Sequence, residues 1–230
     1  MQDGQPQGLA PSPIARMLLD LAERGVEGSV VVGGRRVVLR GRSVVDVLPG
    51  ENDDDLGEFL VRASRITARE LAGARADAKA TGEPLSSVLR RLPSVGDDTL
   101  STARRAVWLD RLVRGIGVDE ERRQEPAPFV PDPPSGQVEG RVALVPLILD
   151  ALARRANHRD AELVGASATF RFTWEDGPHR EEAERWAGLA DLPGPQHVAR
   201  LLSRTPAAAP RIAALIRAGL AYLMPPRSTR

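Results

Sequence analysis

The sequence predicts an α+β protein: an antiparallel β-meander with helices, a duplicated helical hairpin, and a helix-rich C-terminal part ending in a winged-helix-like module. Three observations predict it. Short valine-rich runs follow one another between residues 28 and 48, residues 56–114 repeat with a shift of 29, and two helical stretches separated by a turn occupy the end. With 230 residues, 42% of them hydrophobic, the chain can form one or two packed cores.

The N-terminal part divides into a polar leader and a helix followed by strands. Residues 1–12 are rich in Gln and Gly, and we expect a disordered leader there. Residues 13–55 form the next unit, in which apolar positions at helical spacing predict a helix from Pro13 that Gly25 can end. The runs 28–32, 35–40 and 43–48 then predict three antiparallel strands, because Gly33-Gly34 suits a tight hairpin turn.

Residues 56–124 contain the internal repeat. Each unit reads as a short helix, a turn and a longer helix, over 56–62 and 68–80 and then over 85–91 and 98–114. Thr67 and Asp97 are the expected N-caps of the longer helices. Two units are fewer than a solenoid needs, so we expect them to pack on the meander and the first helix. The shift aligns Leu56 with Leu85, Leu60 with Leu89, Ile66 with Val95, Leu71 with Leu100, and Ala74 with Ala103.

A proline-rich linker over residues 125–137 precedes the C-terminal α+β part, residues 138–230. There the pattern predicts helices over 144–156, 181–189, 196–204 and 210–218, and a strand over 168–174. Gly219 occupies a left-handed position after the last helix, and residues 220–224 read as a short strand or wing.

Composition and motifs argue against several classes of function. The chain has no cysteine and a net charge of +1, which excludes thiol chemistry and names no partner by bulk charge. It has no phosphate-binding glycine loop and no nucleophile elbow, and its three histidines lie at no metal-ligand spacing. We therefore expect no enzyme activity, no cofactor and no metal. With no signal peptide or apolar span, we expect a cytoplasmic protein without a membrane partner.

Two groups of residues are candidate binding sites. Trp108 with Arg104, Arg105 and Arg111 could form a partner groove with a tryptophan anchor, or could mark the core face of its helix. The arginines of the C-terminal segment could contact phosphate, although the helix 210–218 has no Asn, Gln or Ser to read base edges. These C-terminal candidates are Arg200, Arg204, Arg211 and Arg217.

The chain resembles the PatA-like N-terminal domain family, whose members have no known biochemical function and are often attached to bacterial response regulators. The resemblance lies in "GSVVVGGRRVVLRGRSVVDV", "LGEFLVRASRITARELAGARADAKATG", "VALVPLILDALARRA" and "VARLLSRTPAAAPRIAALIRAGLAYL". It implies a signalling or regulatory adaptor rather than an enzyme.

The repeated unit is separately similar to the N-terminal domain of pilus and secretion ATPases, which binds cyclic di-GMP through two motifs that begin Arg-Leu-Gly and end on Gln. Here the two Arg positions hold Asp55 and Pro84, and the two Gln positions hold Ala78 and Val107. Because guanine and phosphate need Arg and amide donors, we do not expect cyclic di-GMP binding.

The sequence therefore predicts a non-catalytic cytoplasmic signalling or adaptor module that acts by binding another protein. Two alternatives stay open: a DNA-binding regulator that uses the C-terminal arginines, and a degenerate cyclic di-GMP sensor.

Overall fold

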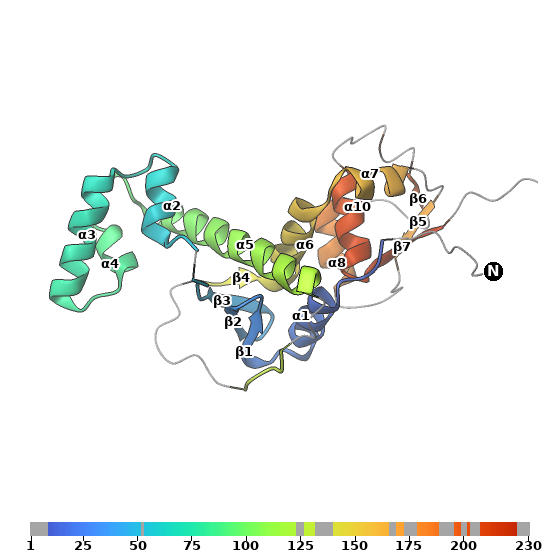
Figure 1. Ribbon diagram of the computed structural model, residues 1–230, viewed down its shortest axis with the longest axis horizontal. Coiled ribbons are helices and arrows are strands. Elements are labelled where there is room, and N and C mark those ends of the chain that lie inside the picture. The colour runs from blue at the N-terminus through green and yellow to red at the C-terminus, as the bar shows by residue number, and fades with distance from the viewer. Residues whose placement is uncertain are drawn as a thin grey trace, which may run out of the picture.

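The protein is elongated, with helices at both ends and a small β-sheet beneath its middle (Figure 1). The structure is a computed structural model. It describes residues 9–51, 53–122, 127–131, 140–165, 169–172, 179–188, 196–198, 202 and 208–224.

The first helix and the meander form as expected. Helix α1 (Pro13–Arg24) is N-capped by Ser12 and ends at Gly25, whose φ of 60° lies in the left-handed region. Strands β1 (Glu27–Val32), β2 (Arg35–Arg40) and β3 (Ser43–Val47) pair antiparallel in this order. A short strand from much later in the chain, β4 (Val142–Ala143), pairs with β3 and completes a four-stranded sheet.

Parts of the expected leader and linker belong to this fold. The Ser12 N–H donates to the carbonyl oxygen of Arg217 at 2.6 Å, so ordered structure begins before Pro13. Val130 exchanges two backbone hydrogen bonds with Ser29, which places residues 127–131 along the outer edge of β1. Residues 1–8 and most of the linker lie outside the described residues.

The repeat builds a small helical lobe with its own core. It comprises α2 (Leu56–Arg62), α3 (Ala68–Thr81), α4 (Leu85–Leu89) and the start of α5 (Asp97–Arg122). All but one of the buried residues of this core are partners at the 29-residue shift; Val88 is the exception. They are Leu60, Ile66, Leu71, Ala74, Val88, Leu89, Val95, Leu100 and Ala103.

The two units also repeat an ion pair. Arg62 at the end of α2 pairs with Asp54, and Arg91 just after α4 pairs with Glu83. Both arginines lie eight residues after their acidic partner. Hydrophobic spacing and ion pairing therefore both support an internal duplication.

The packing of this lobe differs from the expectation. Helices α3 and α4 lie away from the meander and from α1, at one end of the molecule (Figure 1). Helix α5, which is 26 residues long, extends from the lobe and packs against the sheet and α1. The lobe does not need the meander as a packing surface because its two units bury their leucines against each other.

Helix α5 also packs against the C-terminal part, which surrounds α6 (Leu144–Arg155). Pro146 lies in the first turn of α6, where its missing N–H breaks no helical hydrogen bond. Helices α8 (Arg180–Ala187) and α10 (Ala208–Arg217) pack against α6 and against each other, and α7 (His158–Gly165) packs against α10.

A second sheet, in the order β6-β5-β7, lies at this end of the molecule. Its strands are β5 (Thr169–Phe172), β6 (Gln196–His197) and β7 (Ala221–Met224). The expected helix over 196–204 is wrong at its start, because Gln196 and His197 pair with β5 as a strand. Gly219 has the expected left-handed φ, 75°, and a strand follows it. A winged-helix assignment stays a prediction.

Candidate functional site

Two residues of the predicted group of four, Trp108 and Arg111, lie inside the protein. Trp108 is 4% exposed and belongs to the larger core. Arg111 is 8% exposed, and its guanidinium donates to the carbonyl oxygens of Val47, at 2.5 Å, and Asp54, at 2.7 Å. Trp108 is thus not available as a surface anchor, and of the two interpretations the core face is the one that the structure shows.

Arg111 belongs to a polar cluster beside the sheet. Burial lowers the pKa of Arg111 from its ordinary value, against the opposing effect of Asp53 and Asp46. Burial raises the pKa of Asp46, although the Val47 N–H, Arg111 and Trp108 oppose the shift. This cluster holds the connector after β3 against α5, which is a structural role.

Asp53 lies at the edge of the same cluster, and its carboxylate accepts from Arg35 at 2.7 and 2.8 Å. Burial alone would raise its pKa. The hydrogen bonds from Arg35 and from the Gly50 N–H outweigh burial, and the pKa of Asp53 is lowered.

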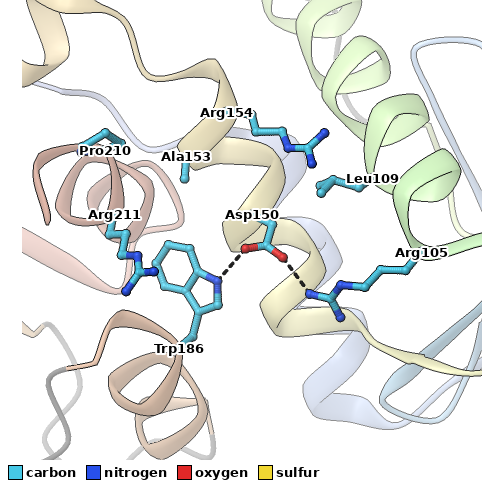
Figure 2. A pocket seen from close by; sticks show the side chains of 8 residues that line it. All are labelled: Arg105, Leu109, Asp150, Ala153, Arg154, Trp186, Pro210 and Arg211. Atoms are coloured by element: carbon cyan, nitrogen blue, oxygen red, sulfur yellow. Dashed lines mark hydrogen bonds and ion pairs between the residues drawn. The ribbon is translucent and has the colours of Figure 1, made fainter. Parts of the chain in front are cut away.

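The third residue of this group, Arg105, lines an open groove between α5, α6, α8 and α10. Arg105 is half-exposed, and its Nη2 lies 2.7 Å from Oδ2 of Asp150 on α6. Figure 2 shows Asp150 at the centre, with Arg105 reaching it from α5 and Trp186 from α8. The groove has a volume of about 400 Å³. Its lining consists of Arg105, Leu109, Asp150, Ala153, Arg154, Trp186, Pro210 and Arg211.

One hydrogen bond and one cation–π contact hold the Trp186 ring in place. Its Nε1 donates to Oδ1 of Asp150 at 2.8 Å, and the guanidinium carbon of Arg211 lies 5.8 Å from the ring centroid. Arg211 also donates to the carbonyl oxygen of Ala187 at 3.4 Å. The indole is therefore oriented before any ligand arrives, with a cation on one of its faces.

The groove carries an excess of positive charge. Three arginines and one aspartate line it, and Asp150 pairs with Arg105 alone among them. Arg154 and Arg211 are exposed, and no carboxylate of the residues that the structure describes pairs with either. The apolar part of the lining is Leu109, Ala153 and Pro210.

Of the expected C-terminal arginines, the two that the structure describes have different surroundings: Arg211 is exposed, whereas Arg217 is held in ion pairs. Arg217 is 20% exposed at its side chain, and its Nη2 lies 3.1 Å from both carboxylate oxygens of Asp160, which is buried. Glu120 of α5 lies 3.6 Å from Arg217 and 3.2 Å from Arg155. Arg217 thus neutralises buried Asp160 and half-buried Glu120, while Arg200 and Arg204 lie outside the described residues.

The fourth residue of the Trp108 group, Arg104, is half-buried. Its Nη1 lies next to Gly140, so that a Cβ added at residue 140 would be 2.6 Å from this atom. It does not line the groove. The sequence patterns therefore predicted Arg105 and Arg211 as binding residues but gave no such prediction for Asp150 and Arg154. A usable signal was present, because Asp150 is the only acidic residue in α6 and interrupts its apolar run from Leu144 to Ala153.

The positions that correspond to cyclic di-GMP ligands in the secretion ATPases have structural roles here. Asp55 caps α2 in a capping box with Glu58, and Arg75 pairs with both carboxylates, which lowers the pKa of Glu58. Val107, at one of the Gln positions, is buried. At these two positions the lobe therefore has a helix-capping residue and a core residue.

Within the described part of the chain, no group of three or more His, Asp or Glu side chains could hold a metal ion. None of the described helices is both long enough and apolar enough to cross a membrane. Comparisons of the chain with protein-family models, with curated proteins and with solved structures found no match.

Proposed function

We propose that this chain is a non-catalytic, cytoplasmic signalling or adaptor module that binds another protein in the groove around Asp150. The observation that carries the proposal is the pair of exposed arginines, Arg154 and Arg211, beside an indole already held in place by Asp150. Tryptophan and arginine are the residue types that most often dominate binding energy at protein interfaces. The resemblance to PatA-like domains supports the signalling context.

The bonding of Asp150 favours a binding role over a catalytic one. Each of its two carboxylate oxygens already accepts a hydrogen bond, one from Trp186 and one from Arg105. A carboxylate in this arrangement orients its neighbours, whereas a general base needs an oxygen directed at a substrate proton.

Affinity capture from the native cytoplasm tests the proposal. The tagged chain is compared with the double variant Arg154→Gln/Arg211→Gln, each with and without nuclease. The matched control is Arg65→Gln/Arg69→Gln, which removes two exposed arginines from the distant helical lobe. We expect a stoichiometric protein that survives nuclease, is retained by the control and is lost from the groove variant.

Other outcomes favour the alternatives. A partner that vanishes with nuclease would overturn protein binding and favour nucleic acid as the ligand. A rise in melting temperature with cyclic di-GMP would favour the sensor hypothesis, because a ligand of the native state raises its apparent stability. Turnover of a metabolite by the purified chain would overturn the non-catalytic proposal.

A further inference from the structure

The charge and shape of the groove point to the chemistry of its occupant. We infer that the groove binds an acidic segment of the partner protein, with carboxylates on Arg154 and Arg211 and one apolar side chain against the indole of Trp186. This inference rests on the proposed function, which requires only that the groove bind a protein.

The charges of the groove lining favour an acidic occupant. The groove lining contains three arginines and one aspartate, Asp150, so its net charge is +2. Asp150 forms an ion pair with one of these arginines, Arg105. Guanidinium groups pair with carboxylates through two parallel hydrogen bonds, which makes Arg154 and Arg211 suited to Asp or Glu side chains. A basic segment would instead add positive charge beside these arginines.

The placement of the groups favours a peptide over a nucleic-acid strand. A phosphate backbone needs a row of cations, and here a carboxylate, Asp150, lies in the middle of the arginines (Figure 2). One face of the Trp186 ring is already covered by Arg211, which leaves less of the indole for base stacking. Arg217 on the same helix, α10, is held in ion pairs with Asp160 and Glu120.

The apolar residues and the volume of the groove limit the occupant to a short segment with one apolar side chain. Leu109, Ala153 and Pro210 lie around the same opening as the arginines. A volume of about 400 Å³ is near the lower end of small-ligand sites, so the groove accepts a few side chains rather than a whole helix. The fitting occupant is therefore a short segment in which Asp or Glu flanks one apolar residue.

Selection from a phage-displayed library of random dodecapeptides on the full chain tests this inference. We expect sequences enriched in Asp and Glu around Leu, Ile or Phe, which are absent when the bait is Arg154→Gln/Arg211→Gln. Selected peptides that are neutral or basic but still depend on the groove arginines would overturn the acidic segment and leave the proposed function standing. Selection unaffected by the groove variant also overturns the inference, while the capture experiment tests the proposed function separately.

A spectroscopic measurement then locates one selected peptide. The chain has three tryptophans, and the indole N–H signal that disappears in Trp186→Phe is the signal of Trp186. We expect the Trp186 signal to shift on titration and the dissociation constant to rise about tenfold for each arginine removed. The Arg65→Gln/Arg69→Gln control should bind like the wild type. A shift confined to another indole would place the peptide elsewhere and overturn the inference.

Discussion

The closest approach between the β1–β2 hairpin and α5 makes Gly115→Ala a sharp test of how this helix is held. A Cβ at residue 115 would lie 2.7 Å from the carbonyl oxygen of Val32 and 3.2 Å from its Cγ1. An ordinary contact needs at least 3.4 Å. The hairpin must therefore move by about 0.7 Å, the difference between these distances, and backbone rather than a flexible side chain must give way.

The expected loss of stability follows from these contacts. Overpacking of this kind costs about 1–3 kcal/mol. Moving the hairpin also weakens the 2.7 Å hydrogen bond from the Gly33 N–H to buried Asp119, which adds about 1 kcal/mol. Replacing Gly by Ala inside a helix returns about 1 kcal/mol. We expect a net loss of about 1–3 kcal/mol, or a melting temperature lower by about 3–10 °C for a chain of this size.

Urea unfolding followed by tryptophan fluorescence measures this loss, because Trp108 and Trp186 both lie in the body that α5 helps to form. The matched control is Gly73→Ala in α3, where an added Cβ meets nothing within 4 Å. It gains the same helix propensity without a clash, so its stability should be unchanged or higher. A Gly115→Ala variant as stable as Gly73→Ala would refute the close approach.

Three further substitutions test the ion pairs. Asp160→Asn leaves Arg217 without its buried charged partner, and we expect the free energy of unfolding in urea to fall by about 1–3 kcal/mol; an unchanged value contradicts this role. Asp53→Asn removes a carboxylate whose pKa is lowered by its hydrogen bonds to Arg35. The stabilisation by this carboxylate is fully present above the unfolded pKa of about 3.8 and is lost as the pH falls through the folded pKa. The variant should be less stable at pH 7 by about 2 kcal/mol, and the difference should shrink below pH 4; a constant difference argues against the charge. Asp150→Asn removes an ion pair that is partly exposed, so it should lower stability by about 1 kcal/mol or less and strengthen binding of the selected acidic peptide several-fold; weaker binding would refute the charge argument.

Local patterns in the sequence predicted most of the elements. The meander was predicted from its alternating valines and glycine turns, and its strands agree with the expected ones to within one residue at each end. The duplication was predicted from leucines 29 residues apart, which form the core of the helical lobe. These features depend on neighbouring residues and on helical or strand periodicity, both of which the sequence contains directly.

Tertiary contacts overrode local preference at two places. Gln196 and His197 have a helical context in the sequence, yet β5 offers them backbone hydrogen bonds as a strand. Residues 127–131, expected as linker, pair with the edge of β1 through Val130. In both cases the partner is distant in the chain, so no local pattern reports it.

The sequence by itself determined most of the helices and the three strands of the meander, because periodicity, caps and turns act within a few residues. Only the tertiary structure decided the surroundings of individual arginines. It placed Arg111 and Arg217 in internal polar clusters and left Arg105 and Arg211 on a groove with Asp150 and Trp186. The four groove residues come from four different helices, so they meet only where α6 packs between α5, α8 and α10. The charge of a side chain is read from the sequence, but its freedom to bind depends on which carboxylates the fold brings beside it.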